Sequence, residues 1–354
     1  MTALLYLAED LGWAARGQPL IPYVATPPPD PDPEDPPPAP ASWQAAVDAM
    51  DVTQAVLWYE AYSGHDGINP ADPFDMPLQV QDLTGTGAGI DSQYDGEVIE
   101  GKVASRFRIR HNNVTIRRCR IVPSPTTIYA VQLYPTTGTT FTGCVVEFCT
   151  VAASNTEAAP FMLRPALTDS TAVTVRHNDV FGTITGGRLE NRCVAEYNFF
   201  HDFGHPPGGH ASGIRFMGAH GIARRNLLTD SSSSNLGMYL DQGFMHSVTY
   251  EGNIVGGTIT MPDGRVISPQ ASPSYGMILG MGDGSTLEPY DLKILDNYWY
   301  GGYQFGLTSG NIPWGVDGNV RSGNRALQTF TVQPGSASNE RTYLAGELLP
   351  FNDQ

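Results

Sequence analysis

The sequence is poor in charged residues and in long hydrophobic stretches. Only 16% of its 354 residues are Asp, Glu, Lys or Arg, and no apolar run is long enough to cross a bilayer. The 36 acidic residues outnumber the 20 basic ones, which gives a formal net charge of −16. An acidic surface is repelled by nucleic acid and by anionic membranes. We therefore expect neither nucleic-acid binding nor membrane insertion.

Cysteine is also scarce, and its spacing excludes the common zinc motifs. The four cysteines, Cys119, Cys144, Cys149 and Cys193, include no Cys-x-x-Cys pair. We expect small, reduced side chains in the core rather than a disulfide framework. The first ten residues lack the basic segment of a secretory signal, and acids follow their short apolar run, so no signal peptide is expected.

Glycine and proline are abundant, and one short pattern recurs along the chain. The 39 Gly and 28 Pro suit many turns and short strands. Val114–Ile121 alternates apolar and polar residues around a cysteine, and Val173–Val180 repeats this shape around an asparagine. The anchor residue returns at intervals of roughly 20 to 45 residues, which is typical of the coils of a parallel β-solenoid. The predicted ladder of anchors is Cys119, Cys144, Asn178, Asn198, Asn226, Asn253, Asn297 and Asn319.

A second strand precedes the ladder strand and reads small residue, apolar, any residue, apolar. It is found, for example, at Ala130–Leu133 and at Gly213–Phe216. Alternation with a period of two directs the apolar pair inward and the intervening residues outward, where a ligand can reach them. The predicted outward residues are Gln132, Tyr134, Met162, Arg164, Arg215, Met217, Tyr239 and Asp241.

The order of segments predicts five regions. Residues 1–26 form a short N-terminal anchor, and residues 27–41 form a Pro- and Asp-rich linker, expected to be an extended polyproline II tether. Residues 42–90 hold a capping helix and connecting loops. Residues 91–325 form the solenoid, and residues 326–354 form a C-terminal cap or tail.

Two elements interrupt the repeats. An apolar stripe over residues 42–62, preceded by Ser42 as N-cap, predicts a helix that covers the first coil and so closes an open edge. Thr258–Ser268 predicts a β-hairpin that turns at Pro262-Asp-Gly264 and projects from the solenoid.

The chain resembles the right-handed parallel β-helix proteins of the pectin-lyase-like group. The resemblance is carried by Ile99-Glu-Gly-Lys-Val103, by Arg108-Ile-Arg-His-Asn-Asn-Val-Thr-Ile-Arg-Arg-Cys-Arg-Ile121 and by the Asn ladder. It implies an all-β fold, a single-stranded right-handed parallel β-helix. The group includes lyases, hydrolases, epimerases, phage tailspikes and adhesins, so this fold alone does not define an activity.

The succession of a short anchor, a Pro-rich spacer and a β-helix also resembles minor tail or tailspike-type proteins of phages that infect actinobacteria. This resemblance implies a virion protein at the tail tip, made in the host cytoplasm, that contacts a glycan of the host cell envelope. Other tail-tip proteins would hold residues 1–41, and the β-helix would form a homotrimer. We expect no cofactor.

An alternative function is cleavage of an envelope polysaccharide by a lyase or a glycoside hydrolase. Such an enzyme needs an acid and a base on one outward face. The polygalacturonase-type and pectate-lyase motif sets are absent from the sequence, and Gly209-His210 is the nearest fragment. The candidate catalytic residues are Asp202, Asp230 and Asp241, with Arg215 placed to hold an acidic sugar.

Three histidines, His201, His205 and His210, stand close together in the sequence. They could bind a metal ion with Asp202, or they could belong to a polar surface loop. Flat rings stack on sugars and arginines bind their polar groups, so the residues assigned to substrate binding are Tyr134, Arg164, Arg215, Tyr239, His205 and His210. The aromatic run Tyr298–Tyr300 would either join this surface or pack beneath the hairpin.

Overall fold

The computed structural model describes most of the chain after residue 38. The chain divides into two compact units, Met1–Pro37 and Pro38–Gln354, and only the second contains described residues. The predicted anchor 1–26 and most of the linker 27–41 therefore lie outside them. The described residues are 39–68, 83–84, 88–123, 129–134, 140–153, 159–163, 165, 171–183, 185–203, 212–229, 234–238, 246–269, 275–278, 290–301, 303, 306–309, 312, 314–332 and 341–349.

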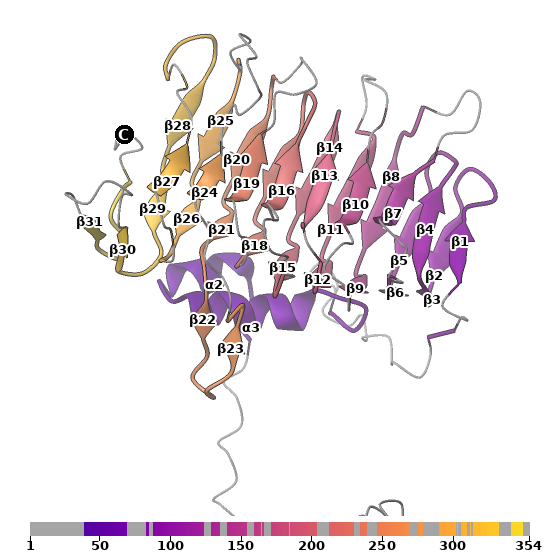
Figure 1. The fold of residues 1–354 in the computed structure, drawn as a ribbon, viewed down its shortest axis with the longest axis horizontal. Coiled ribbons are helices and arrows are strands. Elements are labelled where there is room, and N and C mark those ends of the chain that lie inside the picture. Colours follow the sequence, from indigo (N-terminus) through magenta and orange to yellow (C-terminus); the bar gives the residue numbers. More distant parts are fainter. Residues whose placement is uncertain are drawn as a thin grey trace, which may run out of the picture. The chain divides into compact units, whose positions relative to one another are not determined.

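Three parallel sheets, each with nine strands, make up the main body (Figure 1). Sheet 1 contains β1 (Gly89–Asp91), β4 (Arg106–Ile109), β7 (Tyr129–Leu133), β10 (Ala159–Leu163), β13 (Gly187–Leu189), β16 (Ser212–Phe216), β19 (Ser234–Met238), β24 (Tyr275–Ile278) and β27 (Gly306–Ser309). Sheet 2 contains β2 (Val98–Glu100), β5 (Thr115–Arg117), β8 (Cys144–Glu147), β11 (Val173–Arg176), β14 (Cys193–Glu196), β17 (Ile222–Arg224), β20 (Thr249–Glu251), β25 (Lys293–Leu295) and β28 (Val320–Ser322). Sheet 3 contains β3 (Val103–Ala104), β6 (Arg120–Ile121), β9 (Thr150–Ala152), β12 (Asp179–Phe181), β15 (Phe199–His201), β18 (Leu227–Leu228), β21 (Ile254–Val255), β26 (Tyr298–Trp299) and β29 (Arg325–Ala326).

Successive strands along the chain enter the three sheets in turn, so each coil adds one strand to each sheet. We number the coils from one to nine in chain order. Within a strand the side chains alternate: Phe107 and Ile109 of β4 are buried inside, while Arg106 and Arg108 are partly exposed. The predicted all-β solenoid is confirmed at this level, and its long stacked parallel sheets are compatible with a parallel β-helix.

An asparagine ladder lies in the turns between sheets 2 and 3. Asn226 is fully buried, and its Nδ2 donates to the carbonyl of Ala195 and to Oδ1 of Asn253, both at 2.9 Å. Its Oδ1 accepts from the backbone N–H of Asn198 at 3.0 Å and from Nδ2 of Asn198 at 2.8 Å. Both ends of each buried amide are thus satisfied by neighbouring coils. The ladder asparagines are Asn178, Asn198, Asn226, Asn253, Asn297 and Asn324.

Two predicted ladder positions are wrong. The backbone N–H of Cys149 donates to Oδ1 of Asn178 at 2.9 Å, and that of Asn297 donates to Oδ1 of Asn324 at 3.0 Å. Cys149 and Asn324 therefore occupy the slots that the pattern gave to Cys144 and Asn319. All four cysteines are buried and unpaired, as expected.

Helices α2 (Trp43–Asp48) and α3 (Val52–Tyr62) lie along the outer side of sheet 3 (Figure 1). The predicted N-cap is confirmed, because Oγ of Ser42 accepts from the N–H of Ala45 at 3.1 Å. The expected cover over the first coil is wrong. The apolar side chains of both helices pack on coils five to nine, against residues that include Phe199, Leu227 and Leu327. Among the described residues, no helix combines the length and the apolar character needed to span a bilayer.

Outward residues of the ladder turns form a stack beneath α3. The ring of His177 lies between Phe148 (centroids 4.9 Å apart) and Tyr197 (5.1 Å), with both pairs nearly parallel. Trp58 of α3 covers this stack at 6.1 Å from His177. Nδ1 of His177 bonds to the carbonyl of Tyr62 at 2.9 Å, which ties the end of α3 to coil four.

The predicted hairpin is confirmed as β22 (Ile259–Thr260) and β23 (Val266–Ile267), which pair antiparallel. Gly264 in its turn has φ +85°, a conformation that favours glycine. The hairpin also folds back onto α3: Ile259 and Ile267 are buried in the same apolar cluster as the helices, and Arg265 pairs with Glu60.

The chain ends with β30 (Phe330–Val332) and β31 (Arg341–Tyr343), a second antiparallel pair. Phe330 and Tyr343 join the interior apolar cluster, and Phe330 packs edge-on to Tyr303 of the last coils. Trp299 and Tyr300 are almost fully buried. Tyr300 packs in the cluster that joins the helices and the hairpin, whereas Trp299 packs in the interior of the solenoid, so neither ring is part of an exposed ligand surface.

Candidate functional site

Backbone pairing matches one residue of each coil across sheet 1, and we call this set the sheet 1 row. Its members Arg108 and Arg188 lie on the outer face of the sheet. Backbone pairing fixes this row across all nine strands. The row contains three arginines and only one acid. Its members are Asp91, Arg108, Gln132, Met162, Arg188, Arg215, Gly237, Ile278 and Ser309.

Tyr134, just after β7, is the centre of a compact cluster at this face, which we call the Tyr134 cluster. The guanidinium carbons of Arg108 and Arg110 lie 5.0 and 4.6 Å from the centroid of its ring. Asp91 holds both arginines, at 3.9 Å from Nη1 of Arg108 and 2.8 Å from Nη2 of Arg110. Tyr134 remains 42% exposed despite these contacts. The cluster therefore presents an oriented aromatic ring together with guanidinium donors.

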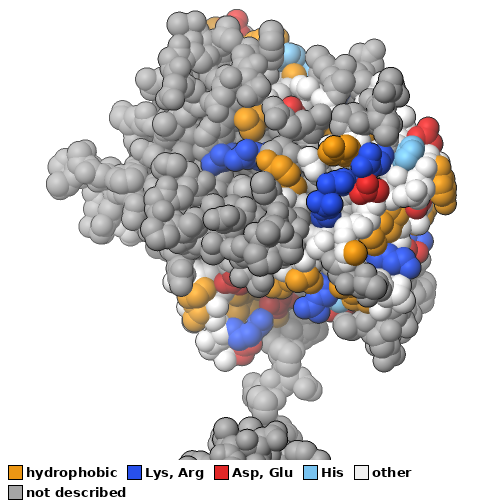
Figure 2. All heavy atoms as spheres, turned by 45° about the vertical axis from the view of Figure 1, so that its right-hand side comes forward, with side chains coloured by type: hydrophobic (Ala, Val, Ile, Leu, Met, Phe, Trp, Pro, Cys, Tyr) orange, Lys and Arg blue, Asp and Glu red, His pale blue; other side chains and the backbone are white. Residues whose placement is uncertain are grey.

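Such a combination is suited to a sugar. An aromatic ring offers a flat apolar surface and a hydroxyl group, and guanidinium N–H groups bind hydroxyl or carboxylate oxygens. Figure 2 shows a face of the molecule where Lys and Arg side chains lie beside acidic and hydrophobic ones. On a chain with a net charge of −16, a surface that carries several arginines can oppose the overall charge locally.

The outer face of sheet 2 has a different pattern. The register-matched residues on this face alternate between negatively and positively charged side chains. The ion pairs Arg117–Glu100, Arg176–Glu147 and Arg224–Glu196 have N–O distances of 2.9, 2.6 and 2.6 Å. Each of these arginines lies between two glutamates of neighbouring strands, so its charge is balanced within the sheet. The row contains Glu100, Arg117, Glu147, Arg176, Glu196, Arg224 and Glu251. We interpret this face as structural.

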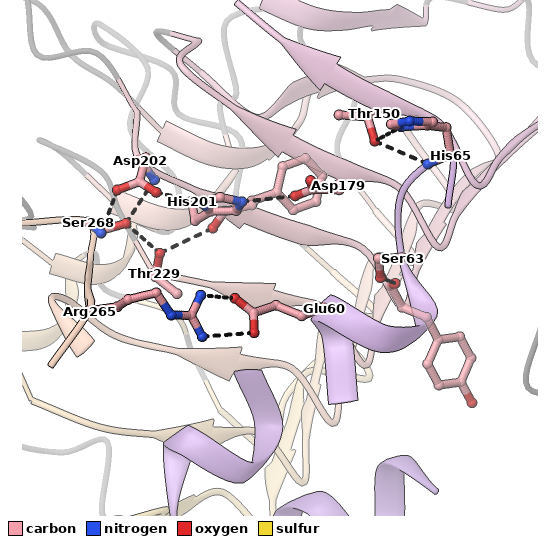
Figure 3. A network of polar contacts seen from close by, with 12 residues as sticks. Glu60, Ser63, His65, Thr150, Asp179, His201, Asp202, Thr229, Arg265 and Ser268 are labelled. Atoms are coloured by element: carbon pink, nitrogen blue, oxygen red, sulfur yellow. Dashed lines mark hydrogen bonds and ion pairs between the residues drawn. The ribbon is translucent and has the colours of Figure 1, made fainter. Parts of the chain in front are cut away.

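A second polar network surrounds His201 at the end of β15 (Figure 3). Its Nε2 bonds to Oδ1 of Asp179 at 2.8 Å, and its Nδ1 bonds to Oδ2 of Asp202 at 2.6 Å. The other oxygen of Asp202 accepts the backbone N–H of Ser268 at 2.6 Å, and Oγ of Ser268 accepts the backbone N–H of Asp202 at 2.8 Å. Ser268 follows β23, so this network fastens the hairpin to coil five. We call it the hairpin clasp.

The electrostatics of the clasp agree with a structural role. Burial by itself lowers the pKa of His201, but Asp179 and Asp202 together raise it to about 9. His201 is therefore protonated near neutral pH and donates from both ring nitrogens. Burial tends to raise the pKa of Asp202, yet the contacts with His201 and with the Ser268 N–H lower it. Asp202 is held as a carboxylate whose two oxygens are both engaged.

These contacts bear on two predictions. Asp202 is poorly placed to act as a general acid or base, because its hydrogen bonds already stabilise its ionised form. His201 cannot be a metal ligand in this state, because a ligand must offer a free ring nitrogen. No group of three or more potential ligands with metal-binding geometry occurs among the described residues.

The other predicted site residues divide into two groups. Tyr134 and Arg215 both lie on the outer face of sheet 1, as expected, but they belong to coils three and six and do not meet. The remaining ones lie outside the described residues; they are Asp230, Asp241, Arg164, Tyr239, His205 and His210.

Sequence reasoning missed Arg108, Arg110 and Arg188 as surface candidates. Arg106-Phe-Arg-Ile109 shows the same apolar alternation as the predicted strands that precede each ladder strand. Its outward Arg108 could therefore have been identified from the pattern. Gly187-Arg-Leu189 is too short for such an identification. No protein-family model matches the chain, and a search of curated proteins finds no match either.

Proposed function

We propose that this protein is a bacteriophage tail-tip component whose β-solenoid contacts a glycan of the host cell surface. The observation that carries the glycan contact is the Tyr134 cluster, a half-exposed ring oriented by two arginines that Asp91 holds. The sheet 1 row extends the surface along the solenoid, so it suits an elongated polymer better than a small molecule.

The tail-tip role rests on the resemblance of the segment order to tailspike-type proteins. In this proposal the solenoid is a right-handed β-helix of the pectin-lyase-like kind and assembles as a homotrimer. Residues 1–41 connect it to other tail proteins. Mass spectrometry of purified particles from the phage that encodes the chain tests this assignment, and absence of the protein from those particles would refute it.

Binding without cleavage is the better-supported activity. Of the three candidate acids, Asp202 is committed to the hairpin clasp, and nothing among the described residues favours a lyase or hydrolase. Incubation of the protein with host-envelope polysaccharide should give binding without new reducing or unsaturated ends. Appearance of such ends would restore the enzymatic alternative.

The variant Tyr134→Ala tests the glycan contact directly. We expect it to weaken binding of the envelope polysaccharide by roughly fivefold or more, because a stacked aromatic contributes ~1 kcal/mol beyond its buried area. Tyr94 is exposed outside this cluster, so Tyr94→Ala is the matched control and should bind normally. Equal binding by both variants and the unmodified protein would refute the site.

A further inference from the structure

Two cysteines occupy neighbouring slots of the buried ladder. Arg120 and Thr150 are register partners on β6 and β9, and Cys119 and Cys149 directly precede them. The backbone N–H of Thr150 donates to the carbonyl of Cys119 at 2.9 Å, which sets the two cysteines opposite each other in coils two and three. Both side chains are buried, and their Cα atoms are about 4.8 Å apart, the spacing of adjacent strands. This separation lies inside the range that disulfide bonds span.

The two thiols also contact each other through a hydrogen bond. This bond with Cys149 lowers the pKa of the Cys119 thiol below its ordinary value, whereas burial raises the pKa of Cys149 well above it. Cys119 is therefore the more easily ionised of the two, and the thiolate is the form that reacts with oxidants. The pair combines a reactive sulfur with a second sulfur within its reach.

The other two cysteines form a contrasting pair. Cys144 and Cys193 share a column of sheet 2, but Val173 stands between them as the register partner of both. Two strand spacings, about 9.6 Å, separate them, which exceeds the ~7 Å that a disulfide can bridge between Cα atoms. Burial raises the pKa of both thiols, which disfavours their reactive form. The chain thus contains one pair of buried cysteines that can be linked and one pair that cannot.

We propose that Cys119 and Cys149 form a redox-sensitive site, which is a dithiol in a reducing medium and a disulfide between coils two and three in an oxidising one. The thiolate of Cys119 attacks hydrogen peroxide, the O–O bond breaks, and a sulfenic acid forms on Cys119 while one water leaves. Sγ of Cys149 then attacks Sγ of Cys119, the S–O bond breaks, and a second water leaves. In total the two thiols supply two electrons and two protons, and one peroxide becomes two waters.

Coil one is the only coil that precedes this pair in the described part of the solenoid. Sγ of Cys119 donates to the carbonyl of Ile99 in that coil at 3.6 Å, so local opening of coil one uncovers Cys119 first. We therefore expect oxidation to be slow and limited by this opening. The chemistry does not depend on the proposed function. A tail-tip protein, made in a reducing cytoplasm and then released from the cell, would meet both conditions.

Oxidation of the full chain tests the site. The protein is purified under reducing conditions, freed of reductant and treated with an equimolar amount of hydrogen peroxide. Remaining thiols are then alkylated in denaturant, and the peptides are analysed by mass spectrometry without reduction. We expect the Cys119 peptide to be linked to the Cys149 peptide, whereas Cys144 and Cys193 remain open to alkylation. In the variant Cys149→Ser, the sulfenic acid on Cys119 should persist and react with dimedone.

Urea unfolding of the oxidised and reduced forms measures the effect of the link. The two cysteines stand 30 positions apart, and closing a loop of this length should raise the urea midpoint by about 1 M. Cys144→Ser is the matched control, because it removes a buried thiol of coil three and leaves the pair intact, so it should keep both the link and the shift. Comparison of the two redox forms of each variant cancels the cost of the substitution itself.

Three results would overturn the inference. The first is that all four thiols stay unreacted even in mild urea that opens coil one. The second is that links to Cys144 or Cys193 form as readily as the link between Cys119 and Cys149. The third is that Cys149→Ser shows the same rise of the urea midpoint on oxidation. Polysaccharide binding by Cys149→Ser should match that of the unmodified protein, so failure of the redox site is distinguishable from failure of the proposed function.

Discussion

The Asn ladder allows a stringent test of how the solenoid is stabilised. The variant Asn226→Ala removes the hydrogen-bond partner of three buried groups. These are the backbone N–H of Asn198, one Nδ2 hydrogen of Asn198 and the carbonyl of Ala195. Each buried group left unsatisfied costs about 1 to 3 kcal/mol. We therefore expect a loss of roughly 3 to 9 kcal/mol in the free energy of unfolding. That is a large fraction of the stability of an ordinary domain.

The assay is equilibrium unfolding in urea, followed by far-ultraviolet circular dichroism. The matched control is Asn112→Ala, because Asn112 is partly exposed and its Oδ1 accepts a single bond, from Thr142 N–H at 2.9 Å. The control should lose about 1 kcal/mol. Equal losses in the two variants would refute the reasoning, since the ladder would then contribute no more than a surface hydrogen bond.

Three further predictions concern the histidines and the hairpin. Burial lowers the pKa of His177 from 6.5 to about 4, so folding favours its neutral form, and stability should fall by roughly 3 kcal/mol as the pH drops through this interval. His177→Gln should flatten that part of the pH profile of urea midpoints; an unchanged profile contradicts the prediction. The pKa of His201 is raised to about 9, so its effect on stability runs the other way. The contribution of His201 to folding stability is complete below pH 6.5 and is lost as the pH rises towards 9, and His201→Gln should abolish this alkaline loss of stability. Asp202→Asn should speed amide exchange at Ser268, whereas Asp263→Asn at the hairpin tip should not; equal exchange in both variants would show that the clasp does not hold the hairpin.

The solenoid could be predicted from the sequence because its stacked coils repeat the same pattern of buried and exposed residues. Period-two alternation and a buried Asn per coil are requirements of every coil, so they recur visibly. The exact ladder slot was harder to predict. Cys144 and Cys149 both fit the local pattern, and only the bond from Cys149 to Asn178 of the next coil distinguishes them.

The position of the helices was not predictable, for a similar reason. The stripe from Trp43 to Tyr59 shows that one side is buried, but it does not identify the partner. That partner is the outer surface of coils five to nine, which becomes apolar only through residues far apart in sequence, such as Phe199 and Leu327. The hairpin clasp likewise joins Asp202 to Ser268 through space, so the sequence offered Asp202 only as an acid near histidines.

The central claim is that the outer face of sheet 1 holds the glycan. The most direct measurement is a crystal structure of the protein with an oligosaccharide of a host-envelope polymer. Our account predicts a sugar ring against Tyr134, within reach of the guanidinium groups of Arg108 and Arg110. An oligosaccharide bound on the alternating charges of sheet 2, or along the helices over sheet 3, would contradict it.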